Sequence, residues 1–214
     1  MKQKKKLLKK SRLYVVIDKG VLRNRDLSNA VIKTRDTGAQ IIQLRDKEQK
    51  KELILQNAYL LHKLLSKDNV IYIINDHLDI AKIVDSDGIH LGQNDIPIEI
   101  ARRVLGKDKI IGISCHSLKQ AQIAQKKGAD YIGIGPIFPT PTKPENRKTI
   151  NLKIIKILKK KIKIPFFVIG GINKNNIKLV TSRGVKRIAI ASAILESKDI
   201  SQATSYFSKI LNSK

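Results

Sequence analysis

Cysteine, aromatic residues and long apolar runs are scarce in this chain of 214 residues. Its one cysteine, Cys115, excludes a disulfide framework within the chain. Aromatic residues make up only 4% of the composition, so an aliphatic core is expected, as in buried parallel strands flanked by helices. No apolar run is long enough to span a membrane, and the lysine-rich start lacks the apolar core of a signal peptide. We therefore expect a cytoplasmic protein that does not bind membranes.

Acidic residues are also few, at 18 Asp and Glu against 43 Lys and Arg, which gives a net charge of +25. Such an excess is typical of proteins that bind nucleic acid or anionic membranes. However, the sequence has no helix-turn-helix, zinc-finger, RRM or KH signature, and its aromatic residues do not alternate with basic ones. We interpret the lysines as a solvated surface that attracts phosphorylated small molecules, and nucleic-acid binding is kept as an alternative of a different class.

Eight apolar, strand-like runs alternate with helix-like periodic segments from one end of the chain to the other. This order predicts a single-domain (β/α)8 TIM barrel over residues 12–214, with an open doubly wound sheet as the second choice. Residues 1–11 are predicted to be a mobile basic lead-in. The predicted strands are Tyr14–Asp18, Ile41–Arg45, Val70–Asn75, Gly88–Leu91, Ile110–Ser114, Tyr131–Gly135, Phe166–Gly170 and Arg187–Ala191.

Polar residues follow the second, third and fourth strands, where a TIM barrel places its chemistry. Gln43 and Arg45 share one face of their strand and Lys47 follows in the loop, which indicates an anion-binding edge or, alternatively, a set of surface ion pairs. Asp76 and Asp95 follow neighbouring strands and can converge. One or two carboxylates with substrate phosphates form a typical magnesium site, so we favour a metal site over two helix N-caps.

The fifth, seventh and eighth strands end in small polar or glycine residues. Ser114 is expected to donate a hydrogen bond to a substrate, whereas its neighbour Cys115 is expected to be packed, and His90 and His116 to be structural. Gly171 and the turn at Ala191–Ser192 fall in the two loops that form the usual phosphate site of a TIM barrel.

Taken together, these motifs resemble thiamine-phosphate synthase from Tyr14 to about Ile194. The piece from the sixth strand is the most specific, and the order of the pieces agrees with the family. The matching segments are Gln43–Lys47, Ile74–Asp76, Asp87–Gln93, Asp130–Lys143 and Ile169–Ile172.

The resemblance implies a transferase of thiamine biosynthesis. It would condense 4-amino-2-methyl-5-(diphosphooxymethyl)pyrimidine with 4-methyl-5-(2-phosphoethyl)thiazole, or its carboxylated form, and release diphosphate. It also implies one Mg²⁺ per subunit, held by Asp76 and Asp95, and leaves the oligomeric state open. The residues implied for the pyrimidine diphosphate are Gln43, Leu44, Arg45, Asp46, Lys47, Asn75, Ser114 and Lys143, of which Arg45, Lys47, Ser114 and Lys143 would be catalytic. Those implied for the thiazole phosphate are Thr140, Pro141, Thr142, Gly171, Ala191 and Ser192.

A thiazole tautomerase of the same fold is the nearest alternative. Such relatives place a histidine in the segment that corresponds to Gly135–Ile137, where this chain has Pro136. They also do not need the metal carboxylates Asp76 and Asp95. The residues therefore favour the synthase.

Overall fold

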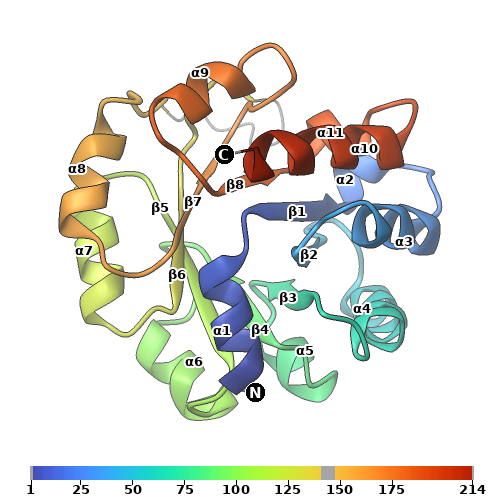
Figure 1. Ribbon diagram of the computed structural model, residues 1–214. Helices are drawn as coiled ribbons and strands as arrows, with labels where there is room; N and C mark the ends of the chain where they lie inside the picture. The colour runs from blue at the N-terminus through green and yellow to red at the C-terminus, as the bar shows by residue number, and fades with distance from the viewer. Residues whose placement is uncertain (1, 141–147, 214) are drawn as a thin grey trace.

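The computed structural model describes residues 2–140 and 148–213. Eight parallel strands close into one barrel in chain order, β1 to β8, with β8 paired to β1 and the helices outside (Figure 1). This confirms the predicted single-domain (β/α)8 TIM barrel and rejects the open sheet. The strands are β1 Leu13–Asp18, β2 Ile41–Arg45, β3 Ile71–Asn75, β4 Gly88–Leu91, β5 Ile110–Cys115, β6 Tyr131–Ile134, β7 Phe166–Ile169 and β8 Ile188–Ile190.

Several helices begin where the sequence supplies a side-chain cap. Asp26, Ser117 and Asp199 each accept a hydrogen bond from a backbone N–H in the first turn of the helix that follows. The helices are α1 Lys2–Lys10, α2 Lys19–Leu22, α3 Leu27–Asp36, α4 Lys51–Leu65, α5 Leu78–Ile83, α6 Ile98–Leu105, α7 Leu118–Lys126, α8 Ile154–Lys161, α9 Ile177–Ser182, α10 Ser192–Leu195 and α11 Ile200–Asn212. None of the described helices has the length and apolar character that a bilayer crossing requires.

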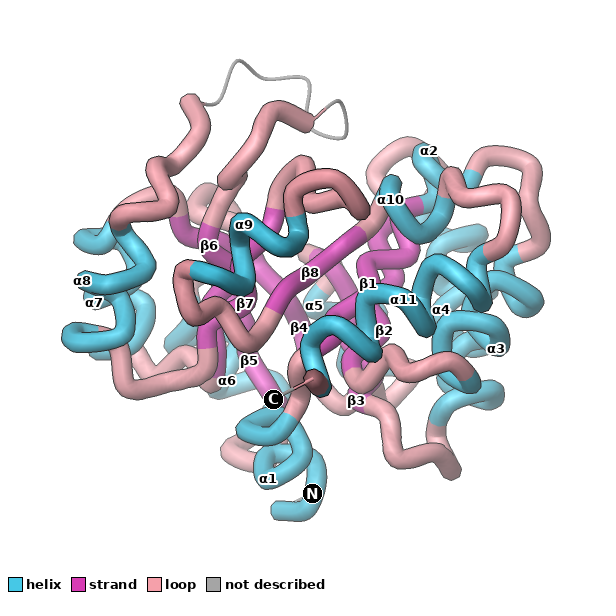
Figure 2. The backbone as a smooth tube through the Cα atoms, turned by 45° about the horizontal axis from the view of Figure 1, so that its top comes forward, coloured by secondary structure: helices cyan, strands magenta, loops and turns pink. Residues whose placement is uncertain are grey.

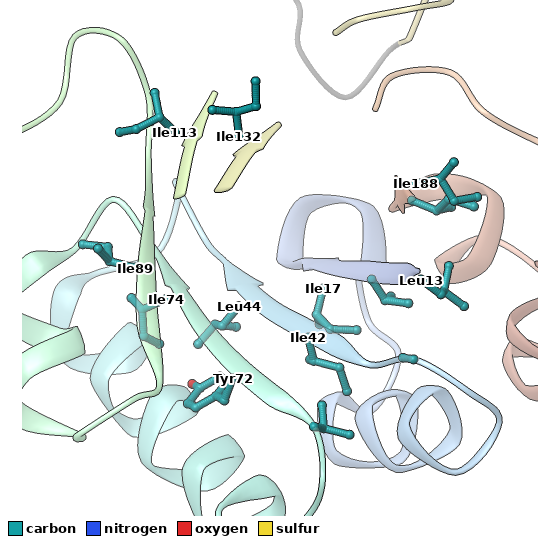
Figure 3. Close-up of a cluster of buried hydrophobic side chains, with 14 of the residues drawn as sticks. Leu13, Ile17, Ile42, Leu44, Tyr72, Ile74, Ile89, Ile113, Ile132 and Ile188 are labelled. Carbon is teal, nitrogen blue, oxygen red and sulfur yellow. The ribbon is translucent and has the colours of Figure 1, made fainter. Parts of the chain in front are cut away.

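The alternation of side chains along each strand divides the core into two layers. Side chains such as Ile17, Leu44 and Ile74 point outward and pack beneath the helices (Figure 3). A second cluster fills the barrel itself and includes Tyr14, Tyr131 and Phe167. Each fully buried aliphatic or aromatic side chain contributes roughly 1.5–3 kcal/mol. The filled interior also means that any ligand site must lie at an end of the barrel.

The first eleven residues differ from the predicted mobile lead-in, because residues 2–10 form helix α1 across the N-terminal end of the barrel (Figure 2). Leu8 is 2% exposed and belongs to the inner cluster. The Nζ atom of Lys4 lies 3.0 Å from an Asp87 carboxylate oxygen, and that of Lys5 lies 2.9 Å from Asp130. The feature of the sequence that indicates helix α1 is the pair Leu7–Leu8. These two residues are too few for a signal-peptide core, but they are enough to anchor one amphipathic helix on the barrel.

Candidate active site

A pocket opens at the C-terminal ends of the strands and encloses about 910 Å³, its open mouth included. Side chains from β1, β2, β4, β5, β6, β7 and β8 line it, together with the loops after β6, β7 and β8. The candidate residues among them are Gln43, Arg45, Ser114, Thr140, Gly171, Ala191 and Ser192. The structure thus brings residues from five predicted motifs to one cavity.

Arg45 is held at the pocket wall by a residue that the sequence motifs did not single out. Its guanidinium forms a hydrogen-bonded ion pair with Asp18, which is 6% exposed and lies directly opposite Arg45 in the β1–β2 register. Asp18 also accepts a hydrogen bond from the Val21 amide at the start of α2, at 3.3 Å. This pair fixes one cation at the rim. The sequence feature that could have identified Asp18 as a site residue is its position at the end of β1.

Asp76 and Asp95 do converge, beside Lys47. Burial raises the pKa of Asp76 and its hydrogen bond to Asp95 raises it further, against the opposing effect of Lys47, whose Nζ lies 3.0 Å away. Burial also raises the pKa of Asp95, but the Asp76 hydrogen bond, the Gly92 amide and the Lys47 charge outweigh it and hold that pKa below its ordinary value. The pKa values of the two carboxyl groups are therefore shifted apart, as those of closely spaced acids are.

The local backbone is shaped around these carboxyl groups. Asp76 has φ +59°, a left-handed conformation that is uncommon for a residue other than glycine and is often found at functional sites. Asp95 does not cap α6, because Pro97 is the capping residue, and its Oδ2 atom accepts from the Gly92 amide at 2.6 Å instead. The N-cap interpretation is therefore wrong for Asp95.

The pair has the chemistry that magnesium requires. Carboxylate oxygens are hard ligands, and magnesium commonly takes one or two of them with phosphate oxygens and water completing its shell. No group of three or more His, Cys, Asp or Glu side chains suited to a metal occurs within residues 2–140 and 148–213. Asp76 and Asp95 thus fit a magnesium ion that a substrate phosphate helps to bind, rather than a closed metal site made by the protein alone.

A chain of hydrogen bonds runs through the floor of the pocket. Gln43 Nε2 donates to the Tyr14 hydroxyl at 2.7 Å, and the Tyr14 and Tyr131 hydroxyls lie 2.9 Å apart. His90 bonds Tyr131 through Nδ1 at 3.0 Å and Ser114 Oγ through Nε2 at 2.9 Å. Burial raises the pKa of both tyrosines, so they remain neutral. The chain fixes Gln43 and Ser114 in position.

Sequence reasoning missed Tyr14 and Tyr131, because an aromatic residue inside an apolar strand looks like ordinary core. His90 was predicted to be structural. It is part of this buried network, and it also lines the pocket.

Asn75 offers a further donor at the end of β3. Its side chain is 6% exposed, and its Nδ2 atom is buried with no hydrogen-bond partner among the described residues. A buried donor without a partner costs roughly 1–3 kcal/mol, so such groups usually have a ligand or water as partner. Asn75 is therefore suited to hydrogen-bond a substrate that lies beside Asp76.

The opposite side of the mouth is made of backbone. Gly170 and Gly171 have φ of +101° and +62°, and a Cβ atom at Gly171 would lie 2.4 Å from the Pro139 carbonyl oxygen. After β8, Ala191 leads into α10, the N-terminus of which no side chain caps. Two such loops with a short extra helix form the usual phosphate site of a TIM barrel. Thr140 lines the same side of the pocket.

Several predicted residues lie elsewhere. Leu44 packs outward beneath the helices, and buried Asp46 accepts from the Glu48 and Gln49 amides at 3.4 and 3.3 Å, so neither side chain lines the pocket. Pro141, Thr142 and Lys143 lie outside the described residues. Cys115 is buried as expected, and burial raises its pKa to about 12.

A barrel rim with a carboxylate pair, fixed cations and a backbone phosphate cradle defines a phosphate-handling TIM-barrel enzyme. The family model described as thiamine monophosphate synthase matches residues 13–194. The thiamine-phosphate synthase of Halalkalibacterium halodurans is 41% identical over 95% of this chain and 96% of its own length. That of Clostridium novyi is 42% identical over 93% of this chain and 98% of its own.

A solved structure gives the same result. The thiamine phosphate pyrophosphorylase from Pyrococcus furiosus superposes with a TM-score of 0.85 at 34% identity, over 97% of this chain and 96% of that one. The chain therefore belongs to the thiamine monophosphate synthase family. It is a transferase of thiamine biosynthesis that condenses the pyrimidine diphosphate with the thiazole phosphate, as the resemblance implied.

Proposed function

We propose that the two substrates share this one mouth, with the diphosphate over β2–β5 and the thiazole phosphate over β7–β8. The observation that carries the proposal is the division of the rim by chemistry. Arg45, Lys47 and the Asp76–Asp95 pair lie on one side, and the Gly171 and Ala191–Ser192 backbone lies on the other. Because Arg45 and Ser192 line the same pocket, substrates bound to the two sides would meet over its floor.

The pyrimidine diphosphate is assigned to the residues of the first side. Gln43 and Asn75 would orient the pyrimidine or its linker, since the chain through Tyr14 holds Gln43 and the Asn75 amide has a donor to offer. Arg45, Lys47 and Ser114 would bind the diphosphate as cations or donors. Lys143 completes this set by resemblance. Leu44 and Asp46 would contribute through the backbone between them, because their side chains are engaged elsewhere.

Asp76 and Asp95 would hold one magnesium ion per subunit. When bound, the ion would neutralise charge that builds up on the departing diphosphate. Lys47 now neutralises Asp76 at 3.0 Å, so ion binding would release its ammonium group toward the diphosphate. The protein's own contribution is thus to place cations and donors where negative charge increases.

The thiazole phosphate is assigned to the second side. Backbone amides around Gly171, Ala191 and Ser192 would bind its phosphate, and Thr140, with Pro141 and Thr142 by resemblance, would contact the ring. Ionisation of the pyrimidine diphosphate would leave a pyrimidine-methyl cation that the thiazole nitrogen captures. No protein nucleophile is required, in agreement with the high pKa of Cys115. The pocket would position the two rings and exclude water.

We further propose that the basic surface serves these phosphorylated substrates and not nucleic acid. Residues 148–195, which include β7, β8 and α10, contain twelve Lys and Arg and no Asp or Glu. The positive potential of these residues draws anions toward the mouth of the pocket. A salt titration of binding to unrelated DNA and RNA tests this. Affinity near the micromolar range at physiological salt, with a steep salt slope, would instead support a nucleic-acid partner.

The decisive experiment is incubation of the folded protein with both substrates and Mg²⁺, with thiamine phosphate and diphosphate as the expected products. A parallel reaction with the thiazole phosphate alone, followed by NMR, detects tautomerisation. Product in the first reaction and none in the second supports the proposal. Tautomerisation alone, with the protein folded by circular dichroism, would assign the chain to the alternative activity.

A further inference from the structure

The inside of the barrel holds two hydroxyl groups in a layer where apolar side chains would pack equally well. Tyr14, Tyr131 and Phe167 form one aromatic cluster, with ring centroids 5.4–5.9 Å apart. Phe167 fills its place without a hydroxyl group. Gly112 leaves room for the Tyr131 ring, since a Cβ atom there would lie 2.0 Å from Tyr131 Cζ. A buried hydroxyl is costly unless it is hydrogen-bonded, so the two tyrosines point to a use for their hydroxyl groups.

Both hydroxyl groups connect residues that line the pocket. We call the connected set the His90 network: Gln43, Tyr14, Tyr131, His90 and Ser114. They are bonded in that order at 2.7, 2.9, 3.0 and 2.9 Å. The five side chains come from β2, β1, β6, β4 and β5. Because burial raises the pKa of both tyrosines, each keeps its hydrogen, and each has two partners within the network.

Gln43 sets the direction of every hydrogen bond in the network. Its Nε2 atom can only donate, so the Tyr14 oxygen accepts and Tyr14 gives its own hydrogen to Tyr131. Tyr131 then gives its hydrogen to Nδ1 of His90, and a neutral His90 carries its hydrogen on Nε2, from which it donates to Ser114 Oγ. With the hydrogen on Nδ1 instead, Tyr14 would have a buried hydrogen that no member of the network accepts.

This direction decides what Ser114 presents to the pocket. Because Ser114 Oγ accepts from His90, the hydrogen of its own hydroxyl group is available to an anion, which suits a diphosphate on this side. In the reverse direction Ser114 would donate to His90, and its oxygen could only accept from a ligand. A phosphate oxygen offers no hydrogen to such a group unless it is protonated.

We propose that His90 is a positioning residue for the condensation. Held by the two tyrosines with its hydrogen on Nε2, it keeps Ser114 as a hydrogen-bond donor toward the pyrimidine diphosphate. This role goes beyond the structural one that the sequence predicted for His90, and it rests on the proposed binding of the diphosphate over β2–β5.

The position of the His90 hydrogen can be measured in the protein without any substrate. Nitrogen-15 NMR of histidine-labelled protein at pH 8, where imidazole groups are ordinarily neutral, distinguishes the ring nitrogen that bears hydrogen from the bare one. The resonances of His90 are those that disappear in His90→Gln. We expect the hydrogen on Nε2. A hydrogen on Nδ1 would overturn this proposal even if the protein makes thiamine phosphate, so the two proposals can fail separately.

A change at the far end of the network tests whether its direction is transmitted. The carboxylate of Gln43→Glu can only accept, so Tyr14 must donate to it, and the His90 hydrogen should move to Nδ1. Gln40→Glu, at the other end of β2, is the matched control. Its Oε1 atom already accepts from the Arg12 and Leu13 amides at 2.7 and 3.3 Å, so this variant should leave His90 unchanged. An unchanged His90 in folded Gln43→Glu would contradict the proposed direction.

Two variants of His90 test the consequence for catalysis. The amide of His90→Gln lies near the former Nε2 position and can still donate to Ser114, whereas that of His90→Asn lies near the former Nδ1 position and cannot. His90→Asn should raise KM for the pyrimidine diphosphate about tenfold, and His90→Gln should restore most of the loss. The KM for the thiazole phosphate should change little in both. Equal effects on the two KM values, with a lowered melting temperature, would reduce His90 to a structural residue.

A double-mutant cycle tests whether His90 acts through Ser114. If it does, Ser114→Ala and the double variant Ser114→Ala/His90→Asn should have the same KM for the pyrimidine diphosphate, because the loss of His90 has no further effect once its partner is gone. Tyr72→Phe, which removes a buried hydroxyl group bonded to the Ala58 carbonyl outside the network, should leave this KM unchanged. Additive effects of the two substitutions in folded protein would overturn the proposal.

Discussion

In the proposed assignment, the two sides of the mouth would bind anions in different ways. The β2–β5 side uses charged side chains, already paired within the protein as Arg45 with Asp18 and Lys47 with Asp76. The β7–β8 side uses backbone, shaped by the positive φ of Gly171 and the uncapped start of α10. Charged side chains can respond to a charge that grows during reaction, whereas a backbone cradle holds a charge that stays constant. The difference matches a leaving diphosphate on one side and a spectator phosphate on the other.

The largest expected loss of activity follows from removing either member of the carboxylate pair. Asp76→Ala and Asp95→Ala should each lower kcat/KM at least about 100-fold, the scale of losing one preorganised charge-stabilising group. A magnesium titration of activity measures this, and unchanged melting curves show that the fold survives. Asp79→Ala, at an exposed carboxylate three residues from Asp76, is the matched control. Full activity in both site variants would contradict the proposal that Asp76 and Asp95 hold the metal ion.

The next largest effect should be confined to one substrate. Arg45→Ala removes a charged partner of the diphosphate and should raise KM for the pyrimidine diphosphate about 10- to 100-fold, the equivalent of 1.5–3 kcal/mol. The KM for the thiazole phosphate should change far less. Initial-rate measurements with each substrate varied in turn separate the two. The reverse pattern would mean that the two sides have been assigned in the wrong order.

The backbone side should be sensitive to shape and insensitive to side-chain chemistry. Gly171→Ala places a Cβ 2.4 Å from the Pro139 carbonyl at φ +62°, so we expect about 1–3 kcal/mol of destabilisation and a raised KM for the thiazole phosphate. Ser192→Ala keeps its backbone amide and should change that KM little. Thermal unfolding and initial rates measure both. If Ser192→Ala alone had a large effect on that KM, the second side would bind its phosphate through side chains as well as through backbone.

The smallest effect on activity is expected from thiol reagents, because Cys115, next to Ser114 in the sequence, is buried. Burial raises its pKa to about 12, so at pH 8 the thiol is neutral in the folded protein. Iodoacetamide should therefore modify it at least about 1,000-fold more slowly than in the unfolded chain, because the thiolate is the reactive form. Mass spectrometry with and without denaturant gives the ratio. Rapid modification with loss of activity would mean that Cys115 is a reactive nucleophile, which contradicts the proposed mechanism.

The same contrast explains what the sequence could predict. Charged side chains after apolar runs are visible in a sequence, so Arg45, Asp76 and Asp95 could be named as candidates. The glycines after β7 and the Ala191–Ser192 turn after β8 likewise indicated a candidate phosphate site. Residues inside the strands were not visible in this way. Tyr14 and Tyr131 look like core until the barrel closes and joins their hydroxyl groups, and Asp18 acquires meaning only from its register with Arg45.

The position of the N-terminal helix α1 has a further consequence for access to the pocket. Since α1 covers the opposite end of the barrel and aromatic side chains fill its centre, the described chain offers one opening to the pocket. Entrance and exit are therefore the same. In the proposed assignment, a released diphosphate would leave past the cations that the next pyrimidine diphosphate requires, so accumulated diphosphate would compete with fresh substrate for the same rim.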